Sequence, residues 1–108
     1  MPVMDLDAAA QRLAELGNAT RLQIVRLLVR SGRDGLAIGE IQARLRVPAS
    51  TLAFHLRGLV GIGLVNQERN GRVVYCRPNF DVINDTLAFV KENCCVDAVA
   101  VDRRRRKA

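Results

Sequence analysis

Residues 48–59 combine one apolar stripe with a set of short polar side chains. Leu52, Leu56 and Leu59 recur at steps of four and three residues, and this spacing predicts a helix with one buried face. Pro48 suits the first turn of that helix, where its missing N–H costs nothing. The other face presents hydroxyl groups, an imidazole and a long cation, which suit phosphates and base edges. The residues that we expect to contact DNA from this helix are Pro48, Ala49, Ser50, Thr51, Ala53, Phe54, His55 and Arg57.

A β-hairpin is predicted directly after this helix. Leu64–Val65 and Val73–Tyr75 flank Asn70–Gly71, a strong hairpin signal because both turn positions need a positive φ. Arg69 and Arg72 lie on either side of this turn, so we expect them to contact DNA as well. A helix that fits the major groove beside a basic hairpin predicts a winged helix-turn-helix.

Positive charge is concentrated in the same part of the chain. The whole sequence has 17 Lys and Arg against 11 Asp and Glu, a net charge of +6. Residues 44–77 contain six arginines against Glu68 alone, whereas residues 78–102 are acidic on balance. The basic segment coincides with the predicted helix and hairpin, as a polyanionic ligand requires. The acidic stretch is better placed for subunit contacts or for a cation.

Length and composition bound the class of protein. With 108 residues, 49% of them hydrophobic, the chain is long enough for one small domain. We expect a cytoplasmic protein without a membrane span, because no apolar run reaches roughly 18 residues and no basic-then-apolar leader opens the chain. Its three cysteines should be thiols in a reducing compartment. One histidine, with no HExxH motif and no phosphate loop, argues against an enzyme.

Apolar periodicity predicts further helices around this core. We expect helices over about 5–16 and 19–30, a short third helix with Ile38, Ile41 and Leu45 inward, and a last helix over about 80–93. The fold class is therefore mainly α with a β-hairpin wing, in the order α-α-α-α-β-β-α. Asn18 or Thr20 can cap the second helix, and this helix should bury Leu22, Val25, Leu28 and Val29.

We divide the chain into two parts. Residues 1–93 form one winged helix-turn-helix domain for DNA binding and dimerisation, and residues 94–108 form a Cys-Cys segment with a basic tail. The run Arg103–Lys107 in this tail either binds DNA without specificity or lies in solvent.

Three stretches of the chain resemble a known family. They are LGNATRLQIVRLL (16–28), IGEIQARLRVPASTLAFHLRGLVGIGLV (38–65) and NGRVVYCRPN (70–79), and together they look like the ArsR/SmtB family of bacterial metalloregulatory repressors. The most specific part is the S-T-x-x-x-H-L-x-x-L run at Ser50–Leu59, followed by Gly63–Val65. The resemblance implies a homodimer that binds a double-stranded DNA operator and releases it when an inducer binds.

Cys94 and Cys95 form a vicinal pair in the sequence KENCCVD, directly after the last predicted helix. Adjacent thiols at a helix end can both turn toward one soft ion. Trivalent arsenic and antimony prefer three thiolates, whereas zinc and cadmium usually complete four ligands with His or carboxylate. The single histidine lies in the predicted DNA-contacting helix at residues 48–59, which we call the reading helix. We therefore expect a trivalent metalloid, arsenite or antimonite, as inducer, with no obligatory cofactor.

The sequence does not decide which group supplies the third ligand to such an ion. The family's C-x-C on the third helix is absent here, and members with a Cys pair after the last helix carry a further cysteine that residues 96–108 lack. Cys76 is separated from Cys94 by the last helix, about 20 Å in one chain. In a family-like dimer these helices run antiparallel, so Cys76 or Asp81 could join Cys94 and Cys95 of the other subunit. Alternatively, Cys76 is a packed strand residue.

Other readings of the same residues stay open. A repressor that responds to thiol oxidation or persulfide would use the cysteines without a metal, and an inducer-independent DNA-binding regulator would not use them. For His55 we expect a phosphate contact or a packing role, because no Cys or His lies three or four positions away to share a metal.

Overall fold

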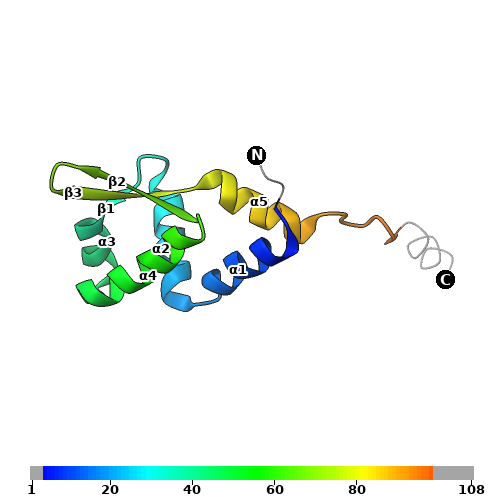
Figure 1. The fold of residues 1–108 in the computed structure, drawn as a ribbon, viewed down its shortest axis with the longest axis horizontal. Helices are drawn as coiled ribbons and strands as arrows, with labels where there is room; N and C mark the ends of the chain where they lie inside the picture. The colour runs from blue at the N-terminus through cyan, green and yellow to red at the C-terminus, as the bar shows by residue number, and fades with distance from the viewer. Residues whose placement is uncertain (1–3, 99–108) are drawn as a thin grey trace.

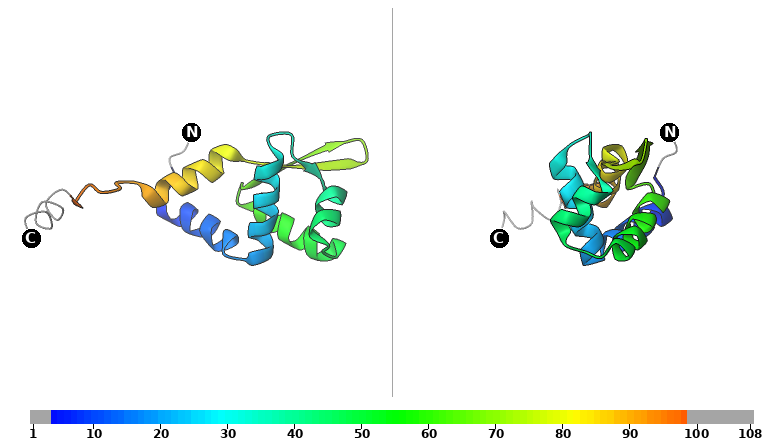
Figure 2. Two further views of the ribbon diagram at one scale, coloured as in Figure 1. Left: turned by 180° about the vertical axis from the view of Figure 1, so that it is seen from behind. Right: turned by 90° about the vertical axis from the view of Figure 1, so that its left-hand side faces the viewer.

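The computed structural model describes residues 4–98 and forms a mainly helical domain with one small sheet (Figure 1). Figures 1 and 2 show the hairpin, α3 and α4 at one end of this domain and α1 with α5 at the other. No helix among residues 4–98 is long and apolar enough to cross a membrane. The tail Arg103–Lys107 lies outside the described residues. The elements are α1 (Leu6–Leu16), α2 (Ala19–Ser31), β1 (Leu36–Ala37), α3 (Ile38–Leu45), α4 (Ala49–Gly61), β2 (Val65–Asn70), β3 (Val73–Pro78) and α5 (Phe80–Lys91).

The predicted order of helices and hairpin is confirmed, and β1 is an addition to it. This strand pairs antiparallel with β3, with Leu36 opposite Cys76 and Ala37 opposite Tyr75. The sheet therefore has the order β1-β3-β2, with β3 in the centre. A strand of two residues is too short to show a period-2 pattern, so the sequence carried no signal for it.

Local signals set the helix starts. The side-chain oxygens of Asp5, Asn18 and Asn79 each accept the backbone N–H three residues on, at 2.8, 3.1 and 3.2 Å. Of the two caps expected for α2, the structure uses Asn18. Pro48 is the N-cap of α4, with extended backbone (φ −60°, ψ 148°), rather than part of its first turn as the sequence suggested. A residue before the helix also needs no intrahelical N–H bond, so the same chemistry fits one position earlier.

The hairpin turn lies one residue later than predicted. Asn70 pairs with Val73 across the strands, so Gly71 and Arg72 form the two-residue loop. Gly71 has φ 65°, whereas Asn70 does not adopt a positive φ. A glycine at the first loop position is typical of a type II′ turn, which needs only one positive φ. Arg72 therefore lies in the turn itself.

A core of aliphatic side chains joins α2, α3, α4 and the sheet. The apolar stripe of α4 is buried as predicted, with Leu52, Leu56 and Leu59 at 0–2% exposure. In α2 the prediction is partly wrong, because Leu22 and Val29 are 43% and 41% exposed. Ile24 is fully buried in their place, beside Val25 and Leu28. A run of consecutive apolar residues fits more than one helical face, and tertiary packing selects the face.

Gly35 permits the close approach of the chain before β1 to β3. It has φ 70°, and an added Cβ would overlap the carbonyl oxygen of Cys76. Gly35→Ala should therefore lower the free energy of unfolding by roughly 2–4 kcal/mol in urea titrations followed by circular dichroism.

Gly71→Ala is the matched control for this substitution. Gly71 also has a positive φ, but its added Cβ meets no atom within 4 Å in the described part of the chain. Gly71→Ala should lower the free energy of unfolding only by the cost of the left-handed conformation, roughly 1–2 kcal/mol. Equal losses for the two variants would contradict the close approach at Gly35.

Candidate nucleic-acid interface

Helices α3 and α4 form the helix-turn-helix. The C-cap residue of α3, Arg46, adopts the left-handed conformation (φ 54°), which turns the chain so that Pro48 can be the N-cap of α4. Ile41 of α3 and Leu52 of α4 are fully buried, so the two helices share one core. Their buried faces fix which side chains of α4 point outward. Of the residues predicted to contact DNA from α4 and its N-cap, the exposed ones are Pro48, Ala49, Ser50, Ala53, Phe54 and Arg57.

Phe54 is the most conspicuous side chain on this outward face. It is 58% exposed, although it is large and apolar. The Arg21 guanidinium lies 5.3 Å from its ring centroid, and the His55 ring meets it edge-on at 5.4 Å. An apolar group held at the surface of a reading helix can contact a thymine methyl group.

Thr51 and His55 are half-buried rather than fully outward. His55 Nδ1 accepts a hydrogen bond from Arg21 Nε of α2 at 3.0 Å, and the Arg21 guanidinium also pairs with the Glu15 carboxylate of α1. The packing role expected for His55 is therefore present. Sequence reasoning missed Arg21 and Glu15, because they lie 34 and 40 positions before His55 and no local pattern links them.

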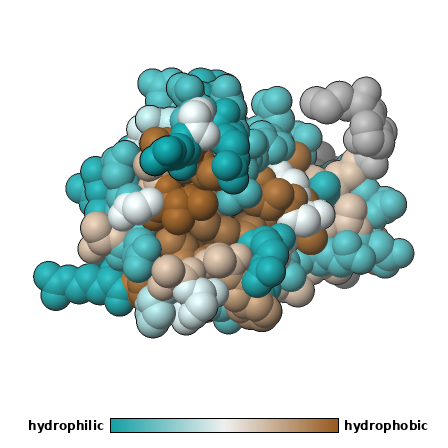
Figure 3. Space-filling view, turned by 60° about the vertical axis from the view of Figure 1, so that its left-hand side comes forward, coloured by the Kyte–Doolittle hydropathy of each residue, from teal (hydrophilic) through white to brown (hydrophobic). Residues whose placement is uncertain are grey.

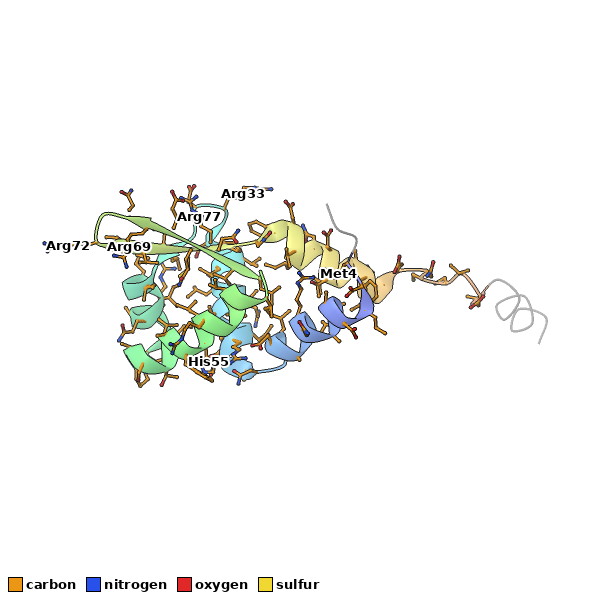
Figure 4. All side chains as sticks on the ribbon, in the orientation of Figure 1. Met4, Arg33, His55, Arg69, Arg72 and Arg77 are labelled. Atoms are coloured by element: carbon orange, nitrogen blue, oxygen red, sulfur yellow. The ribbon has the colours of Figure 1, made fainter. Side chains whose placement is uncertain are left out.

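The hairpin presents its two predicted cations as expected. Arg69 and Arg72 are both exposed, and Figure 4 shows the Arg72 side chain reaching beyond the tip of the hairpin. Arg77 behaves differently, because its guanidinium lies 2.7 Å from the Glu68 carboxylate on the neighbouring strand. Within the hairpin, the positive charge free to meet a polyanion is therefore concentrated toward the tip.

A shallow groove separates the hairpin from the start of α3. It is lined by residues 37–40 on one side and 72–74 on the other. Figure 3 looks obliquely at this end of the molecule and shows apolar side chains gathered in the middle of the face, surrounded by hydrophilic ones. The polar and charged groups thus stand at the edges of this end, where a nucleic-acid backbone can meet them.

The three cysteines lie in two different environments. Cys94 and Cys95 are exposed free thiols directly after α5, with their sulfur atoms 3.3 Å apart. Asn93 and Cys95 both have positive φ, 62° and 64°. Adjacent side chains in an extended chain point to opposite sides, so this turn brings the two sulfurs together.

Cys76 is fully buried in the centre of the sheet. Burial raises the pKa of its thiol, and a hydrogen bond from Gln67 Nε2 at 3.6 Å opposes the rise. Cys76 and the vicinal pair lie beyond opposite ends of α5 (Figure 1), so one chain does not bring the three thiols together. No group of three or more His, Cys, Asp or Glu side chains within residues 4–98 could hold a metal ion.

Comparisons with known proteins agree with the helix-turn-helix and its hairpin. A family model described as a helix-turn-helix domain matches residues 16–68. An ArsR-like transcriptional regulator from Rhodococcus sp. RHA1 is 28% identical, with a TM-score of 0.70 over 94% of this chain and 89% of that one. A possible transcriptional regulatory protein (fragment 1–100) from Mycobacterium bovis is 30% identical, with a TM-score of 0.65 over 80% and 89% of the two chains.

A third solved structure, a possible transcriptional regulator for arsenical resistance, is 25% identical, with a TM-score of 0.66 over 91% of this chain and 96% of that one. A comparison with curated proteins gave no match. The helix-turn-helix, the basic hairpin and these similarities identify a regulator of transcription rather than an enzyme. The chain belongs to the ArsR/SmtB family of winged helix-turn-helix, DNA-binding regulators.

Proposed function

We propose that this protein is a homodimeric repressor that leaves its operator when trivalent arsenic or antimony binds Cys94 and Cys95. The observation that carries the proposal is the pair of exposed sulfurs, 3.3 Å apart, at the end of a helix with an apolar outer surface. An ion bound there acts on the same helix that we assign to the dimer interface.

DNA contacts are divided between α4 and the hairpin in this proposal. Ser50, Phe54 and Arg57 lie on the outward face of α4 and read base edges in the major groove. Arg69 and Arg72 bind phosphates of the flanking backbone, because long cations at an exposed hairpin tip suit charge rather than sequence.

The dimer surface is formed by α1 and α5, which contact each other. Leu6 and Leu13 of α1 are 70% and 39% exposed, and Leu87 and Val90 of α5 are 51% and 60% exposed. Exposed apolar side chains gathered on two neighbouring helices mark an interaction surface. A second copy of the chain can pack against this surface. The dimer then places two α4 helices on one duplex, as palindromic half-sites require.

The geometry of the vicinal pair suits a trivalent metalloid. Two sulfurs 3.3 Å apart, each about 2.3 Å from a shared ion, subtend roughly 90° at that ion. This angle fits the pyramidal bonding of an arsenic or antimony centre that keeps a lone pair, and it is smaller than the tetrahedral angle at zinc. Cys95 has a positive φ, which is uncommon outside glycine, and such conformations concentrate at binding sites.

We assign the third ligand to solvent rather than to Cys76. That thiol is fully buried and its pKa is raised, so forming a thiolate ligand there would require opening the sheet. A water-derived hydroxide or a small thiol can complete the site without this cost. The similarity to a possible regulator for arsenical resistance also favours arsenic as the inducer.

A thiol-oxidation sensor is the second candidate, and the same sulfur separation favours it. Cys94 and Cys95 could form a disulfide with each other, releasing two protons and two electrons to an oxidant such as hydrogen peroxide, which becomes water. Reductant should then restore operator binding, whereas arsenite would act without an oxidant.

The hairpin arginines should contribute affinity without sequence preference. Arg69→Ala with Arg72→Ala should weaken binding to every duplex and reduce the slope of log K against log salt by about 1.8 per subunit, because each phosphate contact contributes about 0.9. Fluorescence anisotropy at several salt concentrations measures this. Arg77→Ala is the control in the same hairpin, since Glu68 already neutralises that cation. A change of sequence preference alone in the double variant would contradict the assignment.

Breaking the apolar surface should separate the subunits. Leu87→Lys with Val90→Lys should give a monomer in sedimentation velocity. Operator affinity should fall by about 100-fold, because the two DNA-binding units are no longer linked and bind separately. Val29→Lys, at a position that is 41% exposed on α2, is the control and should leave a dimer. A wild-type monomer at micromolar concentration would reject this surface.

Arsenite should release the DNA through the vicinal thiols. The Cys94→Ser, Cys95→Ser variant should keep operator affinity and lose the response to arsenite, whereas the wild type should weaken by about 5–150-fold, the usual range of such coupling. Titrating operator-bound protein with arsenite, cadmium, zinc and peroxide measures the response, and Cys76→Ala should respond like the wild type. Continued release of DNA from the double serine variant would show that the pair is not the sensor.

A further inference from the structure

We propose that Arg21 is a positioning residue for DNA binding. It holds the His55 imidazole as a hydrogen-bond donor toward a DNA phosphate, and it links this donor to α1 through Glu15. The inference rests on the proposed DNA contacts of α4 and deepens them. It is independent of the inducer.

The hydrogen bond between Arg21 and His55 fixes the imidazole tautomer. A guanidinium can only donate, so His55 Nδ1 must be the acceptor across the 3.0 Å contact with Arg21 Nε. An imidazole that accepts at Nδ1 carries its proton on Nε2. Arg21 therefore turns His55 into a neutral donor with one defined direction.

The Nε2–H group remains available for a ligand. Within residues 4–98 it makes no hydrogen bond, and no buried side-chain nitrogen or oxygen in this part of the chain lacks a partner. Nε2 therefore reaches solvent. His55 lies on the flank of α4 beside α2, one residue from the outward Phe54 (Figure 4). The flank of a helix in the major groove faces the phosphates along the groove wall, so we assign a phosphate oxygen as the acceptor.

Glycine at position 58 makes room for this arrangement. A Cβ there would lie 3.0 Å from Glu15 Oε2 and 3.1 Å from Arg21 Cζ, so the ion pair packs directly against the backbone of α4. Glycine inside a helix is otherwise unfavourable. Arg21 thus contacts α4 at Phe54, His55 and Gly58 while its guanidinium pairs with α1.

The first test observes the single histidine of the chain by nuclear magnetic resonance. In ¹⁵N spectra at pH 8, wild-type His55 should show one tautomer with a hydrogen-bonded Nδ1, and the Nε2 proton should become protected when operator is added. Arg21→Gln combined with Glu15→Gln removes both charges without leaving a lone carboxylate. In this folded double variant the Nδ1 hydrogen-bond signature should disappear. Its persistence would overturn the proposal.

The second test is a double-mutant cycle in DNA binding. His55→Ala should weaken operator and unrelated duplexes alike, by about tenfold, without changing the salt slope, because a neutral donor releases no counterion. The Arg21→Gln, Glu15→Gln variant should lower the affinity for these duplexes by a similar factor. Combining it with His55→Ala should add little further loss, since the two act through one contact.

Arg26→Gln removes an exposed cation from the same helix and is the matched control; it should leave the His55 spectrum unchanged. Additive losses, with wild-type operator binding intact, would overturn the role of Arg21 alone. A change in operator preference on His55→Ala would overturn the phosphate assignment. A wild-type protein that binds no duplex specifically would instead reject the proposed function.

Discussion

Strand β3 hydrogen-bonds to both β1 and β2, and through them it holds the two ends of the α3–α4 unit. β1 runs directly into α3, and β2 follows the loop after α4. Cys76 lies at the centre of this arrangement, opposite Leu36 on one side and Gln67 on the other. The backbone N–H of Asn79, where β3 passes into α5, also donates to the carbonyl of Leu64 at 3.0 Å. The orientation of the reading helix therefore depends on the same strand that leads into α5.

In the proposed mechanism, this connection is the route by which an ion bound after α5 would act on α4. α5 follows β3 without a linker, since its N-cap is Asn79 and its first residue is Phe80. Arg33, in the turn before β1, lies over the Phe80 ring at 5.4 Å and adds a second contact at this junction. A shift of α5 in a dimer would therefore move a packed unit rather than a loose segment, because close-packed elements transmit displacement.

Sequence patterns predicted the elements where the signal is local. The leucine stripe of α4, the choice of Asn18 or Thr20 as cap of α2, and the hairpin glycine each act within a few residues, so the helix-turn-helix and its wing were predicted. The exact hairpin turn, the buried face of α2 and strand β1 were not, because they depend on pairing and packing with distant residues. The same limit applies to the site. The exposure of Arg69 and Arg72 could be predicted from their positions beside the hairpin turn. The contact of Arg21 with His55 spans 34 residues and forms only in the folded chain.

The polar cluster at Glu15, Arg21 and His55 also constrains how α1 and α4 can move. Arg21 is only 15% exposed, and a guanidinium at such a place is stable only while its partners stay in reach. Moving α1 away from α2 would leave the partly buried Arg21 guanidinium without its carboxylate, and Glu15, whose side chain is 25% exposed, without its cation. Arg21 of α2 therefore links α1, through its ion pair with Glu15, to α4, through its hydrogen bond to His55. On the other side of the domain, β3 joins the helix-turn-helix to α5 by backbone hydrogen bonds. Because α1 and α5 also contact each other, α4 is connected to this pair of helices at two places, through Arg21 and through β3.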